Sequence, residues 1–488
     1  MTRPDPAPLP IGFKITLDPT TKWLDRKTLF GGVPPRVLKL SDAGLTALAR
    51  LENEPVSDAT TGALGRRLTD AGLAHPLPPK PNSPAITVVI PTRDRASQLD
   101  RLLPALITDA PVIVVDDASH DSASVAEVAH RHGARLIVRP VNGGPGPARN
   151  SGLSAVDTDL VAFIDTDCVP SPDWLTGLAA HLADPMVVAA APRIMPLTTG
   201  TPAERYAASR GALDLGPDEA RVAALSRVSY VPTAAIVFRR SALGPTPFDE
   251  ALRYGEDVDL VWRLVADGGR IRYVPSVVVR HAEPESWPRL LQRRFRYGTS
   301  AAPLSRRHPQ RTAALVLSPW PAATVGALLA GRPVLATLAF AGSAVGTRSA
   351  LQRVDVPTAG VVPASARAVR QSWLNLADYS AQAALPLLVA AARRRRRAPL
   401  LALLITPGLR AWWNGDRSLN PVTMIAAVLV DHCAYGLGVW RGCLRERTLR
   451  PWRPFVVRRV LPATTRNAVR RYAGSASRPT SGEPARLE

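Results

Sequence analysis

Two carboxylates, Asp165 and Asp167, stand one residue apart in the segment FIDTDCVPSPDWL, directly after a run of apolar residues. Side chains alternate along an extended chain, so this spacing places both on the same face. Two negative charges this close repel each other unless a cation lies between them, and a hard divalent cation that bridges a diphosphate meets that need. An Asp-X-Asp pair alone is also common as two solvated acids at a strand end. With FI before it and VVDDAS upstream, the pair predicts a site for Mg²⁺ or Mn²⁺.

The segment GGPGPARNSG provides glycines at which a ligand can approach the backbone closely. Gly143, Gly144 and Gly146 have no Cβ atom to obstruct such an approach. The segment is neither a P-loop nor a dinucleotide fingerprint, because no GK[ST] follows and the glycine spacing differs. The alternative interpretation is a simple turn before a helix over ARNSGLSAV.

The elements that must position these residues alternate between apolar strands and amphipathic helices. Strands are predicted at ITVVIP, VIVVDD, RLIVRP and VAFIDTD, with helices around SQLDRLLPALI and SASVAEVAHRHG between them. Strands that are apolar throughout and alternate with helices indicate a parallel sheet covered on both faces, an open α/β domain. Ligands bind at the carboxyl ends of the strands in such sheets. Those ends carry Thr92, Asp116, Asp117, Asp165 and Asp167.

Five motifs in this order, IPTRDR, VVDDASHD, GGPGPARNSG, FIDTDCVPSPDWL and GEDVDLVWRL, resemble those of family 2 glycosyltransferases of the GT-A fold. The resemblance spans about 170 residues. It implies a nucleoside-diphosphate-sugar donor, with Thr92 and Asp117 near the base, Arg149 beside the nucleotide and Asp165 near the ribose. For Asp116 the alternative is a structural turn cap. The full set of predicted substrate-binding residues is Pro91, Thr92, Asp94, Asp116, Asp117, Gly144, Arg149, Asp165 and Arg296.

The same resemblance assigns the reaction chemistry to GEDVDL. An inverting transfer needs a carboxylate that takes the proton of the acceptor hydroxyl, and Asp257 matches the family's base. Glu256 would orient that base or touch the acceptor, and Asp259 is read as a favourable charge at a helix N-terminus. Asp167 would bind the metal with Asp165, and His281 would complete the metal shell as in relatives. A lone His at a strand end is more often structural.

The segment QRRFRYG sits where processive relatives carry a Gln-X-X-Arg-Trp motif. Its Arg296–Tyr297 pair lies one residue too far from Gln292 to match. The arginines of this segment, Arg294 and Arg296, either neutralise the donor diphosphate or cover a helix surface.

The charge of the chain is concentrated in its C-terminal part. Of the formal net charge of +21, +20 belongs to residues 301–488, which contain 27 Arg, no Lys and 7 acidic residues. A basic region beside apolar stretches favours an anionic membrane surface over nucleic acid, since no aromatic residues are interleaved for base stacking. The three cysteines have neither disulfide-framework nor metal-ligand spacing, and MTRPDPAPLP lacks the apolar run of a secretory signal. A cytoplasmic catalytic part is therefore expected.

Three regions are predicted: 1–82, 83–300 and 301–488. In the first, a strand at PPRVLKL precedes two helices that begin at Ser or Thr N-caps, and the Pro-rich residues 76–84 form a linker. This module resembles the winged-helix-like elements with which peptide-modifying systems recognise peptides, with PPRVLKL as the edge to which a peptide would add. The alternative is a cap that packs on the catalytic domain and binds nothing.

The last region is predicted to be mainly helical, membrane-associated on the cytoplasmic face of the cell membrane, and to end in a basic disordered tail. Residues 312–331 carry no charge and are long enough to span a bilayer, but Pro319 and Pro321 interrupt them, so a broken or re-entrant helix is as well supported as a straight span. Later apolar runs are short for membrane spans, and five arginines at 393–397 fit a cytoplasmic surface. The alternative is a helical packing domain with a solvated charge run.

A finer resemblance comes from GFKITLD, KTLFGGVPPRVLKLSDAG, DAGLAHPLPP and the Arg-rich tail, which are similar to the glycosyltransferase family of mycofactocin systems. It implies β-1,4-linked transfer of glucose from UDP-glucose to premycofactocin, a peptide-derived cofactor precursor. The alternatives are a membrane glycosyltransferase that acts on a cell-envelope lipid or polysaccharide and a non-catalytic sugar-nucleotide-binding protein. The intact acidic motifs argue against the last.

Overall fold

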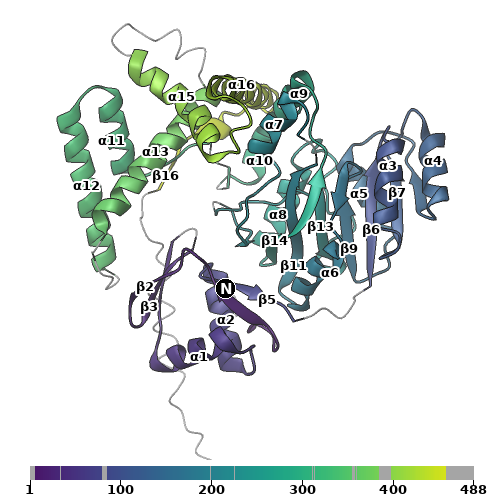
Figure 1. Cartoon of the computed structure of the whole chain (residues 1–488), viewed down its shortest axis with the longest axis horizontal. Coiled ribbons are helices and arrows are strands. Elements are labelled where there is room, and N and C mark those ends of the chain that lie inside the picture. The colour runs from purple at the N-terminus through teal and green to yellow at the C-terminus, as the bar shows by residue number, and fades with distance from the viewer. Residues whose placement is uncertain are drawn as a thin grey trace, which may run out of the picture.

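The computed structural model describes residues 6–32, 35–79, 85–197, 199–224, 226–309, 311–312, 314–353, 358, 360–383 and 397–457. The basic tail, linker residues 80–84 and arginines 393–396 of the predicted charge run lie outside the described residues. Figure 1 shows the main sheet on the right, the small N-terminal module below and to the left of it, and the C-terminal helices at the upper left. The predicted boundary at 82/83 falls within 80–84.

The N-terminal module combines short strands with two helices. Strand β1 (Lys14–Leu17) pairs antiparallel with β5 (Ala74–Leu77), and β2 (Lys22–Asp25), β3 (Thr28–Gly31) and β4 (Arg36–Lys39) form a second sheet in that order. The predicted strand is therefore β4, an edge strand. Pro76 and Leu77, predicted as linker, belong to β5, where the outer position of the strand tolerates the missing N–H of proline.

Local capping defines the two helices. Helix α1 (Asp42–Asn53) follows Ser41, whose hydroxyl accepts a hydrogen bond from the Gly44 amide at 3.1 Å, as predicted. Helix α2 (Ala59–Ala71) follows Asp58 in a capping box, so the predicted Ser or Thr cap was wrong there. Gly72 ends α2 with φ 70°, a conformation that glycine adopts without strain.

Buried ion pairs fix this module to the domain of the main sheet. Both terminal nitrogens of Arg66 on α2 donate to Asp184, at 2.7 and 2.8 Å, and both side chains are buried. Asp70 accepts from Arg270 at 2.7 and 2.5 Å in a second two-pronged pair. The module is thus docked on the sheet domain through α2.

The central sheet has the strand order β10-β14-β11-β13-β9-β6-β7-β8, with β12 paired to β14. As predicted, β6, β7, β8 and β9 are parallel. The other half, which the four predicted strands did not cover, is mixed, because β13 runs antiparallel to both β9 and β11. The strands are β6 (Ile86–Thr92), β7 (Val112–Asp116), β8 (Arg135–Val138), β9 (Leu160–Ile164), β10 (Cys168–Pro170), β11 (Val187–Pro196), β12 (Ala220–Arg221), β13 (Ala235–Arg239) and β14 (Arg270–His281).

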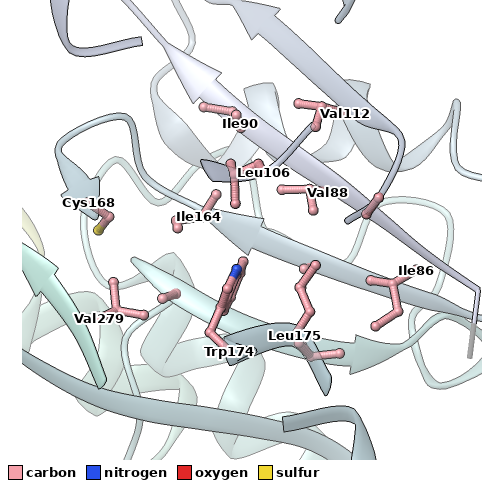
Figure 2. Packing of buried hydrophobic residues seen from close by; sticks show 14 of the residues in the cluster. Ile86, Val88, Ile90, Leu106, Val112, Ile164, Cys168, Trp174, Leu175 and Val279 are labelled. Atoms are coloured by element: carbon pink, nitrogen blue, oxygen red, sulfur yellow. The ribbon is translucent and has the colours of Figure 1, made fainter. Parts of the chain in front are cut away.

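Apolar side chains cover both faces of this sheet. On one face, Val88, Ile90 and Ile164 pack with Trp174 and Leu175 (Figure 2). The other face packs under α5 (Pro145–Leu153) and α8 (Glu256–Ala266). Helices α3 (Ala96–Leu102), α4 (Ser122–Arg131) and α6 (Trp174–Ala179) cover the first face, and α7 (Pro202–Ser209) follows β11. The rigid sheet thereby fixes the loops at its strand ends.

The C-terminal region is helical, as predicted. Its helices are α10 (Ala301–Arg307), α11 (Pro319–Leu329), α12 (Pro333–Gln352), α13 (Val361–Ala383), α15 (Arg397–Asn414) and α16 (Pro421–Arg445), and a short parallel pair links β15 (Val316–Leu317) to β16 (Phe455–Val456). Helix α9 (Trp287–Thr299) packs along α16, so this helical packing begins before the predicted boundary at residue 300. Although the sequence runs looked short for spans, α12 and α16 are long and apolar enough to cross a membrane.

Candidate active site

One cavity of about 1200 Å³ opens at the carboxyl ends of β6 and β9 and extends beneath the N-terminus of α8. It contains all the predicted site residues except Asp116. The lining includes Pro91, Thr92, Asp94, Asp117, Gly144, Arg149, Asp165, Asp167, Glu256, Asp257, His281 and Arg296. The fold therefore gathers residues separated by more than 200 positions in the chain around one space.

Asp117 is held by the glycine-rich loop. Its two carboxylate oxygens accept from the amides of Gly143, at 3.1 Å, and Gly144, at 2.7 Å, and it also pairs with Arg139. Gly144 has φ 94°, which a residue with a side chain rarely adopts, so glycine is required at this turn. The loop therefore forms the turn before α5, and its amides hold Asp117, whereas close approach of a ligand to these glycines stays a prediction.

Thr92 and Asp94 lie at the end of β6. The Thr92 hydroxyl is buried and has no hydrogen-bond partner within the described part of the chain. Asp94, at φ 55°, accepts from the backbone and side chain of His120, at 2.6 and 2.9 Å. These hydrogen bonds lower the pKa of Asp94, so the exposed carboxylate is kept charged at the cavity rim.

Asp116 has a structural place instead of the predicted place in the substrate site. It is the last residue of β7 and fully buried. Its carboxylate accepts from the Ser119 amide at 3.0 Å and from the hydroxyls of Ser119 and Ser122, both at 2.5 Å. It therefore organises the turn into α4, which corresponds to the alternative of a turn cap. Successive residues of a strand point to opposite faces, so only one of Asp116 and Asp117 can face the cavity.

The Asp165–Asp167 pair is neutralised by two arginines. Arg149 donates to Asp165 at 2.7 Å, and Arg95 pairs with Asp167. The pairing of β10 with β14 sets Cys168 opposite His281, which brings the His281 Nε2 atom to 3.5 Å from Asp167 Oδ1. Burial acts to raise the pKa of Asp167, but the charges of His281 and Arg95 outweigh it and lower that pKa. Asp167 is thus kept ionised at physiological pH.

The residues around Asp167 fit a divalent cation in part. The Oδ1 atom of Asp167 is buried without a hydrogen-bond partner in the described residues, and it faces an imidazole. Carboxylate oxygens with an imidazole nitrogen are a donor set that Mn²⁺ accepts, and the carboxylates alone suit Mg²⁺. Among the described residues no three acidic, His or Cys side chains converge as a complete metal site. Remaining ligands would have to come from the diphosphate and water.

The second acidic pair lies at the first turn of α8. Gly255, at φ 81°, starts the helix and exposes Glu256 and Asp257 to the cavity. Arg149 bridges the two pairs, since its other terminal nitrogen donates to Glu256 at 3.0 Å. Burial and then the charge of Asp257 raise the pKa of Glu256 to about 7. Burial also raises the pKa of Asp257, against the opposing charge of Arg149.

Asp259 lies in the first turn of α8, as predicted, and its side chain is buried. It is 1% exposed and accepts from Arg263 at 2.8 Å and from His308 at 2.9 Å. It ties α8 to the end of α10 and takes no part in the cavity lining. Its side chain is therefore a buried structural acid.

Several cavity residues were not foreseen from the sequence. Arg95, which pairs with Asp167, lies in the IPTRDR motif, but the motif alone gave it no role. Glu283 lies 3.5 Å from the second ring nitrogen of His281 and pairs with Arg293, a relation that needs the return of β14 to the site. Arg294 and Arg296 both line the cavity, and Arg294 also donates to Asp431 on α16 at 2.5 Å.

Comparison with known proteins agrees with this architecture. The model of the glycosyl transferase family 2 matches residues 87–243. The pre-mycofactocin glycosyltransferase of Mycobacterium tuberculosis is 38% identical over 467 residues, covering 91% of this chain and 98% of that protein. The succinoglycan biosynthesis protein ExoU of Rhizobium meliloti is 29% identical over 206 residues, or 39% of this chain and 60% of that protein.

Among solved structures, a mannosyltransferase from Pyrobaculum calidifontis in complex with GDP-Man and Mn²⁺ aligns with a TM-score of 0.40 at 20% identity, covering 72% of this chain and 87% of that one. The long alignment with the M. tuberculosis enzyme decides the relationship, because it includes the N-terminal module, the sheet and the C-terminal helices. This chain belongs to the family 2 glycosyltransferases, in the same family as the pre-mycofactocin glycosyltransferase of M. tuberculosis, and has their GT-A fold.

Proposed function

We propose that this enzyme transfers a hexose, glucose from UDP-glucose, to premycofactocin with inversion at the anomeric carbon to form a β-1,4 linkage. The observation that carries the proposal is the single cavity in which two acidic pairs of opposite character face each other across Arg149. The identity of 38% to a pre-mycofactocin glycosyltransferase over nearly all of both chains supports this acceptor.

The residues of the chain divide the work as follows. Thr92 and Asp117 hold the uracil, since a carboxylate accepts the imide N–H of the base. Asp165 holds the ribose, and Arg149 fixes both Asp165 and Glu256 in place. Asp257 takes the proton of the attacking acceptor hydroxyl, and its raised pKa improves it as a base.

Asp165, Asp167 and His281 would hold the divalent cation together with the donor diphosphate. When bound, Mg²⁺ or Mn²⁺ supplies charge that stabilises the departing diphosphate. Arg95 then has to release or share Asp167, because in this structure it occupies that carboxylate.

A donor panel tests the reaction. Full-length enzyme is incubated with premycofactocin and each of several UDP- and GDP-sugars, and the product mass and anomeric configuration are measured. We expect glucose transfer from UDP-glucose and a β-anomer by NMR, because one displacement on an α-linked donor inverts the centre. An α-linked product contradicts the single displacement.

A second candidate acceptor is a cell-envelope lipid or polysaccharide. Exposed apolar residues on the C-terminal helices, including Trp320, Val334 and Leu338, favour an enzyme that works at a membrane. Supplying a membrane extract and premycofactocin in competition separates the two, since labelled glucose then appears in either the lipid fraction or the soluble cofactor precursor.

We also propose that the C-terminal region attaches the enzyme to the cytoplasmic face of the membrane. Helix α12 is the main candidate for insertion, because only 17% of its most apolar stretch is buried inside the protein. The corresponding share for α16 is 44%. Nearby arginines add about 1 kcal/mol each at an anionic surface. Cell fractionation at low salt without detergent tests this proposal. Full-length enzyme in the supernatant would contradict membrane attachment and support a C-terminal region that only packs against the rest of the protein.

For the N-terminal module we propose recognition of the precursor peptide. A groove of about 500 Å³ lies between β2 and α1, lined by residues that include Trp23, Leu45 and Leu48. Its position differs from the predicted docking edge β4, and the exposed edge of β2 beside it suits an added strand. Trp23→Ser in the full-length enzyme should raise the acceptor KM and spare UDP-sugar hydrolysis. If neither the acceptor kinetics nor peptide binding changes in this variant, the module does not recognise the peptide and only packs against the sheet domain.

A further inference from the structure

The far wall of the active-site cavity is built by the C-terminal region. Beyond Asp257 the lining comes from Gln382 of α13, Tyr435 and Val439 of α16, and Trp452, which follows α16. A cavity for one drug-sized ligand measures roughly 300–1,000 Å³. At about 1200 Å³, this cavity leaves room for a second substrate beside the donor.

Glycine contacts fix α16 against the catalytic domain. A Cβ atom on Gly298 of α9 would lie 2.2 Å from the carbonyl oxygen of Tyr435, and one on Gly438 would lie 2.0 Å from that of Phe295. The two backbones thus touch, and neither helix can slide without a clash. Arg294 adds a buried link, since it donates to Asp431 at 2.5 Å and stacks 5.3 Å over the Tyr435 ring. The Tyr435 wall is therefore a rigid part of the site.

Trp452 is held in the same wall by aromatic neighbours. The Tyr379 hydroxyl donates to its carbonyl oxygen at 2.9 Å, with the two rings edge to face at 5.8 Å. The Trp440 ring lies 5.5 Å away on another side. Trp452 is only 7% exposed, yet its indole N–H has no hydrogen-bond partner in the described ranges. Buried indoles usually find one, so a bound molecule that reached this N–H would satisfy it.

The two ends of the cavity differ in chemistry. The donor end presents acids and arginines, whereas the far end presents the rings of Tyr230, Tyr297, Tyr435 and Trp452, with the charge of Arg294 there paired to Asp431. Such rings bind the flat apolar face of another ring and offer hydroxyl or N–H groups at their edges. This end suits an uncharged ring that carries hydroxyl groups.

We propose that Trp452 and Tyr435 form the acceptor subsite and bind the hydroxyl-bearing ring that receives the sugar, so that the C-terminal helices determine acceptor choice. The inference rests on the proposed function and deepens it, because it assigns the acceptor side of the same site. It gives the helical region a role in catalysis that is independent of membrane attachment.

The test compares three variants of the full-length enzyme. Trp452→Ala removes the ring, Trp452→Phe keeps a ring but removes the N–H, and Trp413→Ala removes a tryptophan that is 66% exposed on α15, outside the cavity lining. For each we measure donor and acceptor KM, kcat, UDP-glucose hydrolysis without acceptor, and calorimetric binding of premycofactocin in the presence of UDP.

We expect Trp452→Ala to raise the acceptor KM and Kd about tenfold or more, Trp452→Phe to recover part of that loss, and Trp413→Ala to match the wild type. Hydrolysis and donor KM should stay within twofold in all three. Unchanged acceptor binding in Trp452→Ala, or in Trp452→Phe if the alanine variant does not fold, overturns the subsite. Equal losses of UDP-glucose hydrolysis and of sugar transfer also overturn the subsite, since they show that Trp452 only maintains the structure of the cavity wall. A wild type that neither binds nor glycosylates premycofactocin refutes the proposed function itself.

Discussion

The two acidic pairs of the cavity have similar composition and opposite electrostatic surroundings. Asp167 lies between Arg95 and His281, and its pKa is lowered. Glu256 and Asp257 lie at a buried helix start where a single arginine, Arg149, opposes the desolvation, and their pKa values are raised. A carboxylate with a low pKa suits a ligand for cations, and one with a high pKa suits proton transfer. The surroundings, not the residue type, therefore divide the roles.

The largest effect is expected from breaking the first pair. Asp167→Ala should abolish turnover and the metal dependence of UDP binding, because it removes the carboxylate that contacts both Arg95 and His281. Calorimetric titration of UDP with and without Mn²⁺ measures the binding. Substantial turnover of this variant in the presence of a chelator would show that no divalent cation takes part.

The second pair is tested by removing the base while keeping its shape. Asp257→Asn should lower transfer by roughly 10²–10⁴, the usual range for general acid–base groups, and leave UDP binding intact. Single-turnover kinetics with saturating donor measures the rate of the transfer step. If transfer is unchanged, the base is Glu256 instead, and the roles within this pair are reversed.

A pH profile sharpens the comparison between the pairs. With a pKa of about 7, Glu256 is protonated below that pH and loses its ion pair with Arg149, so we expect kcat/KM to fall as the pH decreases through 7. Glu256→Gln has no such titration, and its acid limb should move to lower pH. If the acid limb of the variant lies at the same pH as that of the wild type, the limb reports the titration of another group.

The smallest effect on catalysis is expected at Asp116. Asp116→Asn leaves one side-chain oxygen to accept from the three donors around the turn. We therefore expect the free energy of unfolding to fall by roughly 1–3 kcal/mol. Donor KM should stay close to that of the wild type. Denaturant unfolding and donor kinetics measure both, and a large rise in donor KM with normal stability would return Asp116 to the substrate site.

The sequence by itself determined the local features of this protein. The run from β6 to β9, the strand-end acids and the helix start at Ser41 follow from apolar periodicity and capping, which act over a few residues. The motifs were also sufficient to place Asp165, Asp257 and Arg149 in one site.

Tertiary structure decided the rest, because it depends on pairing between distant segments. The direction of β13 made the sheet mixed, and strand alternation placed Asp117 in the cavity and Asp116 beneath it. The pairing of β10 with β14 brought His281 to Asp167, and helix packing brought Trp452 to the same cavity from nearly 300 residues away in sequence. No local pattern encodes such contacts, since their energy comes from surfaces that meet only in the folded chain.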